Sequence, residues 1–250
     1  MLSRIYKLII PLLLFLGASS GTTFAASEFR VDGEYWAPRL SGEVKNGSTL
    51  QPHQDLGLDR SALGSLKFSL KKENGPRYFI RYEAPSFSST AALTHSVSLG
   101  GITHNAGDQV AAELNVKHWQ IGVQEEKPFP SGKFSVIYSY HHNFVETTLQ
   151  NTSQQITSRE RHSGDAVSVG FAWETQHARG LNYFAEATPL SIGRNASYQD
   201  YNIGIKSKIG KALTLTTGYR GEKLSAGQQS DSIGSRLHLR GWYIFLAAEQ

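Results

Sequence analysis

The sequence predicts an all-β fold of antiparallel strands, and two observations lead to this prediction. The first is an alternation with a period of two, in which Val167, Val169 and Phe171 are separated by small or polar residues. Such a period places apolar side chains on one face of a strand. The second is the tight turn at 73–76, where Gly75 is free to adopt a positive φ. A soluble sandwich shows the same pattern, so a further signal has to separate the two architectures.

The N-terminus supplies that signal, because residues 1–25 have the features of a secretory signal peptide ahead of one domain, 26–250. Arg4 and Lys7 precede an apolar run over 8–16, and Ala25 ends a suitable cleavage site. The apolar run is too short to cross a bilayer comfortably as a helix. An exported chain of alternating strands is most simply a β-barrel of the outer membrane of Gram-negative bacteria. We therefore predict a single antiparallel transmembrane barrel of about ten strands.

The composition excludes several classes of function. The whole chain has 25 Lys+Arg and 21 Asp+Glu, and two of the basic residues fall in the signal peptide, so the mature domain is nearly neutral. This balance gives no reason to expect a nucleic acid as partner. The chain contains no cysteine, which excludes both disulfides and a thiol site.

The ten strands are predicted in order along the chain. They run over about 29–44, 62–72, 77–84, 111–124, 133–150, 166–174, 181–188, 198–208, 213–220 and 236–248. In the last strand, Leu237, Leu239 and Tyr243 are expected on the lipid-facing side. In the fourth, the apolar phase slips after Val116, which predicts a one-residue bulge near Lys117-His118.

The connections alternate in length. The short ones are 73–76, 127–132, 177–180 and 210–212, and the longer ones are 45–60, 85–110, 151–156, 190–196 and 223–232. Short turns at one end and long loops at the other are typical of outer-membrane barrels, whose short turns lie in the periplasm. An even strand number places both chain ends at that side. The segment 85–110 can add a short strand or hairpin, so the range is eight to twelve strands.

Aromatic residues are expected at both edges of the membrane, where amphipathic rings are favoured. The periplasmic edge would hold Phe29, Tyr78, Phe134, Trp173, Tyr183, Tyr243 and Phe245, and the outer edge Tyr82, Tyr140, Tyr201 and Tyr219.

The chain resembles the small bacterial outer-membrane β-barrel proteins, in the size class of the OmpW-like and OmpX-like barrels. It is more narrowly similar to a family of largely uncharacterised outer-membrane barrels. Three short motifs carry this resemblance: Asp55-Leu56-Gly57-Leu58-Asp59, Gly218-Tyr219-Arg220, and Gly241-Trp242-Tyr243-Ile244-Phe245. The resemblance implies a barrel over nearly the whole mature chain.

Charged residues are expected on the inner faces of the strands. The predicted network consists of Arg30, Asp32, Glu34, Lys67, Arg77, Arg81, Glu83, Glu186, Arg220, Arg236 and Arg240, with Lys71, Glu113, Lys117 and Glu174 beside them. Mixed signs favour ion pairs that fill a narrow lumen. A small conducting pore is the alternative, but long side chains leave little space in ten strands.

No catalytic residue, cofactor or metal site is predicted. His141, His142 and Asn143 form one tempting cluster, and His162, Ser163 and Asp165 another. Neighbouring residues of a strand point to opposite faces, so only one of His141 and His142 can face a given site. The second cluster is expected near a loop, where serine, histidine and aspartate are common. We expect a non-enzymatic, porin-like barrel with a structural, surface-binding or limited transport role. A small-solute channel and a lipid-modifying or hydrolytic enzyme are the alternatives. Expected partners are outer-membrane lipid, lipopolysaccharide and the barrel-assembly machinery.

Overall fold

The computed structural model describes residues 27–46, 48–61, 63–72, 75–176, 180–210, 212–230 and 233–249. The expected signal peptide, 1–25, lies outside these residues. Within them the strands are β1 (Ser27–Trp36), β2 (Arg39–Asn46), β3 (Ser48–Leu50), β4 (Leu63–Lys72), β5 (Arg77–Glu83), β6 (Ser86–Ala92), β7 (Val97–Leu99), β8 (Ile102–His104), β9 (Gln109–Phe129), β10 (Gly132–Asn151), β11 (Thr157–Thr175), β12 (Leu181–Gly193), β13 (Ala196–Ile209), β14 (Leu213–Ser230) and β15 (Ile233–Glu249). A single short helix, α2 (Pro52–Leu56), accompanies them in the described ranges.

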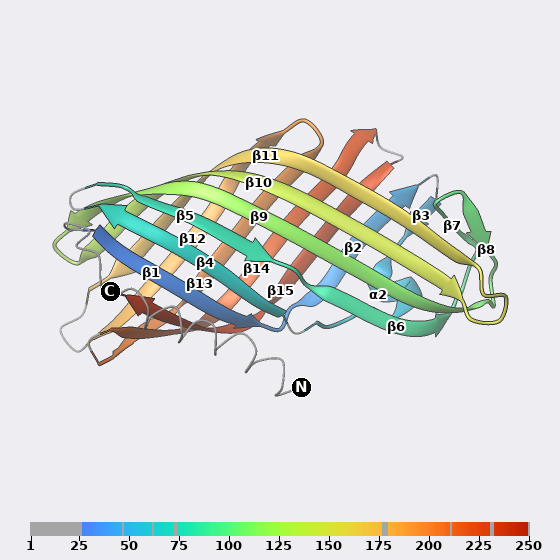
Figure 1. The fold of residues 1–250 in the computed structure, drawn as a ribbon, viewed down its shortest axis with the longest axis horizontal. Helices are drawn as coiled ribbons and strands as arrows, with labels where there is room; N and C mark the ends of the chain where they lie inside the picture. Colours follow the sequence, from blue (N-terminus) through green and yellow to red (C-terminus); the bar gives the residue numbers. More distant parts are fainter. Residues whose placement is uncertain are drawn as a thin grey trace, which may run out of the picture.

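Ten of these strands close into a ring (Figure 1). They pair in the order β1-β4-β5-β9-β10-β11-β12-β13-β14-β15, and β15 pairs back onto β1, all antiparallel. The predicted fold class and the predicted number of about ten strands are confirmed. Arg30 of β1 lies opposite Glu249 of β15, so the first and last strands share the short-turn end of the barrel. Because the ring is closed, its strands satisfy one another's backbone hydrogen bonds.

Other strands lengthen the wall at the opposite end. After Pro38 the chain continues as β2, which pairs with β15, and after Glu83 it continues as β6, which pairs with β9. The hairpin expected within 85–110 is present as β7 and β8, which form a separate two-stranded sheet. The loops expected at 190–196 and 223–232 are wrong, because β12 reaches Gly193 and β14 reaches Ser230.

The longest strands exceed the thickness of a bilayer. β9 has 21 residues, β10 has 20 and β11 has 19. At about 3.3 Å per residue, β9 is roughly 70 Å long, whereas about 9–11 residues are enough for a tilted strand to cross a membrane. Roughly half of each long strand must therefore project beyond a bilayer. Among the described residues, no helix is long and apolar enough to cross a membrane.

The outer surface of the barrel changes character along the strands. On β11 the outward residues Val167, Phe171 and Trp173 are 56%, 39% and 42% exposed, although they are apolar. Further along the same face, Ser163 and Arg161 are exposed and polar. On β5, β9, β10, β13, β14 and β15, outward aromatic residues mark this change: Tyr82, Trp119, Tyr140, Tyr201, Tyr219 and Trp242. We call these residues the outer aromatic ring. The half towards the short turns is the lower half, and the half beyond the ring is the upper half.

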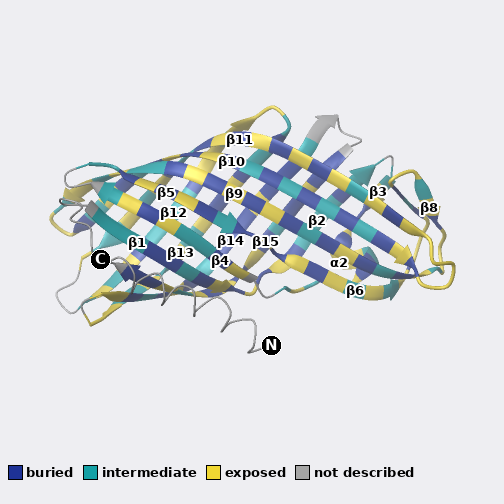
Figure 2. Ribbon diagram, in the orientation of Figure 1, coloured by how far each residue is buried: buried dark blue, intermediate teal, exposed yellow. Residues whose placement is uncertain are grey.

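The interior is divided at about the same level. In the upper half, apolar side chains fill the barrel, and in the lower half polar and charged side chains do so. The apolar cluster, which we call the upper core, includes Leu40, Val44, Phe87, Leu114, Val116, Val145, Leu149, Leu224, Leu237 and Leu239. Figure 2 shows the resulting alternation of buried and exposed residues along the strands. Above the ring water surrounds the wall, so the apolar residues turn inward.

In the upper half the apolar side chains point inward and the polar ones outward, and this inversion overturns two predictions. β9 pairs with β10 without interruption from Val110 to Phe129, so the bulge expected near Lys117-His118 is wrong. Leu114 and Val116 face the upper core, whereas Trp119 faces outward on the opposite side of the strand, and no shift of register is needed. Glu113 and Lys117 are accordingly exposed on the outside and are not in the lumen.

The register predicted for β15 is wrong for the same reason. Leu237 and Leu239 are buried in the upper core, and Tyr243 is buried as well, whereas Trp242 is 71% exposed and Ile244 is 56% exposed on the outside. Phe245 is partly buried against the core, so neither Tyr243 nor Phe245 belongs to the periplasmic aromatic edge.

In the upper half the opposite walls approach each other closely. Asn143 of β10 donates a hydrogen bond to the carbonyl oxygen of Ser225 on β14, at 3.2 Å. His162 of β11 lies 2.8 Å from the hydroxyl of Ser235 on β15. Gly227, at φ 73°, permits this approach, because a Cβ there would lie 2.9 Å from the His162 ring. The upper half therefore resembles two sheets packed face to face.

The long loops add to the upper core. Leu50, Leu56 and Leu58 come from the first loop, where α2 packs against β2 and β6, and each is at most 1% exposed. Leu93 and Val97, from the second loop, are 3% and 0% exposed. Burial of such side chains is worth about 1.5–3 kcal/mol each relative to full exposure. These loops are thus ordered parts of the fold at the upper end.

Candidate functional site

Ion pairs occupy the lower lumen, where the described residues leave a cavity of about 120 Å³. Arg77 lies 2.7 Å from Glu28 and 3.6 Å from Glu126, and Lys71 lies 2.5 Å from Glu126. Lys67 places its ammonium group 4.4 Å from the centre of the ring of another inward residue, Phe79. Long inward side chains therefore take up much of the space in the lower lumen.

A buried cluster around Arg220 of β14 closes the middle of the barrel. Arg220 is 0% exposed, and its Nη1 donates to Glu83 at 2.6 Å and to Glu34 at 3.0 Å. Its Nη2 donates to Glu222 on the same strand. The guanidinium also lies 4.8 Å from the centre of the Trp36 ring. A guanidinium suits this position because its planar fork has five donors and it stacks on aromatic faces.

A second guanidinium completes the cluster. Arg81 lies 2.8 Å from Glu34 and 2.7 Å from Glu83. Glu83, Glu222 and His118 bring ligand atoms within 4.8 Å of one another, which is the spacing of a metal site. Arg220 already binds both carboxylates, however. The two arginines therefore provide the positive charge that a cation would otherwise supply.

A chain of hydrogen bonds extends from this cluster towards β11. Nδ1 of His118 lies 3.3 Å from Glu83, and Nε2 of His118 lies 3.0 Å from Nδ1 of His141. Nε2 of His141 lies 2.7 Å from the Ser168 hydroxyl and 3.1 Å from the Ser139 hydroxyl. The order carboxylate, imidazole, imidazole and hydroxyl is a chemical arrangement that can move a proton or activate an oxygen nucleophile.

This chain was not predicted, because its members lie on four different strands. The signal that reveals it is the two-residue turn between β9 and β10, at Pro130 and Ser131. That turn fixes the register in which His118 lies opposite Asn143. His141 is two residues from Asn143 on the same inner face, so the two imidazoles meet diagonally.

The two clusters that the sequence offered as tempting candidates do not converge, although neither was predicted to be catalytic. His141 and Asn143 are buried inside the barrel, whereas His142 points outward and pairs with Asp165 at 2.8 Å. Ser163 is exposed on the outside, whereas His162 is buried on the inside. Tyr140 donates a second hydrogen bond to Asp165, and both bonds lower the pKa of the Asp165 carboxyl.

The structure places most of the predicted charged network inside the barrel. The inward residues are Arg30, Asp32, Glu34, Lys67, Arg77, Arg81, Glu83, Glu186 and Arg220, together with Lys71 and Glu174. Arg236 and Arg240 are exposed on the outer surface, so their predicted inward placement is wrong. The error follows from β15, where Leu237 and Leu239 face the upper core and turn the residues between them outward.

No protein-family model and no curated protein matches the sequence. Several solved structures are similar to this chain. The outer membrane protease OmpT from Escherichia coli superposes with a TM-score of 0.54 at 7% identity, covering 88% of this chain and 97% of that chain. Ail, the attachment invasion locus protein of Yersinia pestis, gives 0.45 at 7% identity, covering 90% and 100%. This chain has the fold of a bacterial outer-membrane β-barrel. At such low identity the likeness concerns the fold alone.

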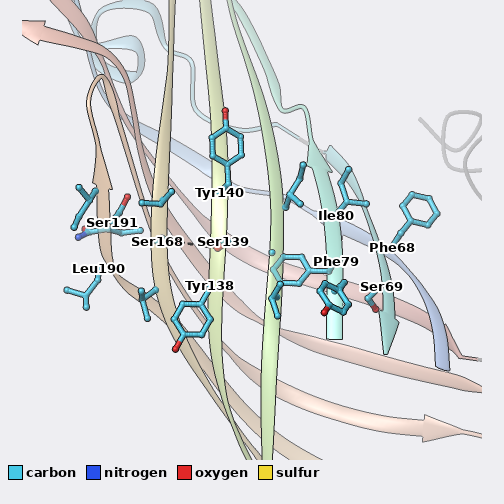
Figure 3. Close-up of a pocket in the computed structure, with 18 of the residues that line it drawn as sticks. Phe68, Ser69, Phe79, Ile80, Tyr138, Ser139, Tyr140, Ser168, Leu190 and Ser191 are labelled. Carbon is cyan, nitrogen blue, oxygen red and sulfur yellow. Dashed lines mark hydrogen bonds between the residues drawn. The ribbon is translucent and has the colours of Figure 1, made fainter. Parts of the chain in front are cut away.

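For an outer-membrane barrel, the apolar outer band of the lower half is the lipid-facing surface. It contains a shallow groove of about 950 Å³ across β4, β5, β9, β10, β11 and β12 (Figure 3). Tyr138, Ile80 and Leu190 line the groove, and Ser139 and Ser168 lie in its floor. The hydroxyls of these serines bond to each other and to His141 on the inner side of the sheet. Only the serine end of the hydrogen-bonded chain therefore borders the groove, and His141 is 0% exposed on the inner side.

Proposed function

We propose that this chain is a closed, non-enzymatic outer-membrane barrel that presents a binding surface outside the cell. The observation that carries the proposal is the double closure of the lumen by the Arg220 cluster and by the upper core. The projecting upper half, with its polar outer faces and ordered loops, supplies the surface.

The double closure argues against the channel alternative. Arg220 in the middle of the barrel and Leu237 above it are each 0% exposed, which supports two closed layers across the lumen. Opening the upper core would expose apolar side chains to water, at about 25 cal/mol per Å² of apolar surface. Opening the Arg220 cluster would separate buried ion pairs, which costs several kcal/mol.

The long strands argue for a role at the cell surface. A barrel that only anchors itself in the membrane needs strands of about 9–11 residues, whereas β9 continues for 21. On the projecting part, Arg159, Arg161 and Glu146 lie outside the barrel, and Glu146 pairs with both arginines. Such a rigid polar wall can support recognition of a partner outside the cell.

A hydrolytic enzyme is the second candidate, because the hydrogen-bonded chain from Glu83 to Ser168 has the residue types of a nucleophilic site. Its members are sealed, however: His141 is 0% exposed and Ser168 is 5% exposed. The outer groove borders Ser168, but apolar side chains make up most of its lining and His141 lies buried on the inner side of the wall.

Conductance in planar lipid bilayers tests the proposal. The wild-type protein is expected to give no stable open channels. A variant that thins both closures, Arg220→Ala with Leu237→Ala, serves as the control that the assay detects opening, and we expect it to give leak currents. Stable, ion-selective channels from the unmutated protein would reject the closed barrel and favour the channel.

A further inference from the structure

Three cations lie side by side on the outer surface of the upper half. Arg39 of β2 is opposite Arg240 of β15 in the register, and Lys223 of β14 is opposite His238 of β15. Arg39, Lys223 and Arg240 are all exposed. Like charges on adjacent strands repel each other, so their gathering on three neighbouring strands needs a reason. We call Arg39, Lys223 and Arg240 the outer cationic patch.

The outer cationic patch has no counterion among the residues that the structure describes. Within the described ranges of the chain, none of its three cations has a carboxylate oxygen within 4.0 Å, whereas Glu43 nearby pairs with Lys45 at 3.3 Å and Arg236 at 3.6 Å.

The field of the patch also acts on His238, which lies between its members. Burial lowers the pKa of His238, and Lys223 and Arg240 lower it further by repulsion. Arg236 acts in the same direction and Glu43 in the opposite one, so the charges that act on His238 are mainly positive.

The patch lies immediately beyond the outer aromatic ring. Trp242, on the same face of β15, is two residues from Arg240, or about 7 Å along the strand. Tyr219 packs edge-on against Trp242 at 5.4 Å. Below Trp242 the same face continues with Ile244, which is 56% exposed. Interfacial rings lie at the level of lipid headgroups, so the cations sit at headgroup height above an acyl-chain surface.

We propose that the outer cationic patch binds the phosphate groups of an outer-leaflet lipid, and that this lipid is lipopolysaccharide. Arginine pairs bidentately with phosphate, and a lysine beside two arginines can neutralise a second phosphate. A lipid that carries several phosphates on an acylated sugar matches several unpaired cations above an apolar wall. The proposal rests on the membrane position of the proposed function, and it adds a binding site to it.

Binding of fluorescently labelled lipopolysaccharide to the full chain in neutral detergent tests this site. The test variant is Arg39→Gln with Lys223→Gln and Arg240→Gln. The matched control is Lys117→Gln with Arg159→Gln and Arg161→Gln, which removes the same charge from the wall of β9 and β11. A cation near a lipid surface contributes about fivefold to affinity, so the test variant should bind on the order of 100-fold more weakly. The control should stay within about threefold of the wild type.

Further ligands distinguish the possible sources of phosphate. Dephosphorylated lipopolysaccharide, phosphatidylglycerol and inorganic pyrophosphate should each bind the wild type much more weakly than lipopolysaccharide. Equal losses in both triple variants would overturn the site, and so would equal binding of phosphatidylglycerol or of free pyrophosphate.

A folding control completes the experiment. Heat-modifiable migration on gels reports whether each variant forms the barrel. If the triple variant does not fold, the single variant Arg240→Gln replaces it, and its affinity for lipopolysaccharide should fall about fivefold. Conductance of the wild type would reject the closed lumen and leave the patch standing, whereas unchanged affinity in the test variant rejects the patch alone.

Discussion

Val169→Arg should impair the barrel far more than Ser163→Arg, although the two positions lie on the same outer face of β11. Val169 stands within the apolar stretch from Val167 to Trp173, near the middle of the lipid-facing band. An arginine near the midplane of a bilayer costs about 2–4 kcal/mol. Since about 1.4 kcal/mol is a factor of ten, the ratio of folded to unfolded protein should fall roughly 30- to 1,000-fold.

Ser163 is the matched control for this substitution. It lies six residues further along the strand, about 20 Å beyond Val169, and it is exposed on the polar upper wall. An arginine there meets water, so the change in stability should stay within about 0.5 kcal/mol.

The assay is urea unfolding from lipid vesicles, with the folded fraction read from heat-modifiable migration. Equal urea midpoints for the two variants would show that Val169 does not face lipid or that the membrane boundary lies elsewhere.

Three further predictions concern the interior. Leu114→Ala should lower the free energy of unfolding by about 2–5 kcal/mol, because Leu114 is fully buried in the upper core. The adjacent outward change Glu113→Ala should have little effect. Equal urea midpoints for the two variants would contradict the inward orientation of Leu114 on β9. Arg220→Leu should lower the free energy of unfolding by about 3–5 kcal/mol, because it leaves three buried carboxylates without a positive partner. Arg220→Lys should recover part of that loss. An unchanged thermal unfolding temperature for Arg220→Leu would refute the central role of the cluster. Burial lowers the pKa of His162, with Glu160 opposing it. The His162 side chain therefore takes up a proton more readily in the unfolded chain, so the free energy of unfolding should fall as the pH drops below about 6.5. In urea titrations at several pH values, His162→Gln should make this dependence on pH weaker. An unchanged dependence would show that other groups cause it.

Most of the lower half could be predicted from the sequence, because there the outer face of each strand meets lipid and the inner face meets the polar lumen. On β11 the outward Val167, Phe171 and Trp173 were expected to meet lipid, and they are exposed as expected. The two-residue period and the turn lengths together determined the strand order and the common end of the termini.

The upper half could not be predicted by the same rule, because the rule equates apolar with outward. Above the outer aromatic ring water lies outside and a packed core lies inside, so Leu114 and Leu237 point inward. In the lower part of β15 both faces are apolar, since Tyr243 is buried and Ile244 is exposed. The sequence there does not choose a face, and the error made at Leu237 carried through the strand.

The site was only partly predictable for a different reason. The charged residues of the lower lumen share one strand face and follow from alternation alone. The chain from Glu83 through His118 and His141 to Ser168 depends on the register between strands, which alternation within one strand does not determine. The short turn between β9 and β10 determines the register for the two imidazoles, and the contacts with Glu83 and Ser168 depend on the registers with β5 and β11 as well.

Single cysteines on β15 test the placement of this barrel most directly. The chain has no cysteine of its own, so each introduced thiol is unique. Intact cells would be treated with a membrane-impermeant maleimide. Arg240→Cys should be labelled from outside, Ile244→Cys should be shielded by lipid, and Leu239→Cys should be shielded in the upper core until the protein is denatured. Labelling of Leu239→Cys or Ile244→Cys in intact cells, with Arg240→Cys protected, would contradict both the register of β15 and the membrane boundary at the outer aromatic ring.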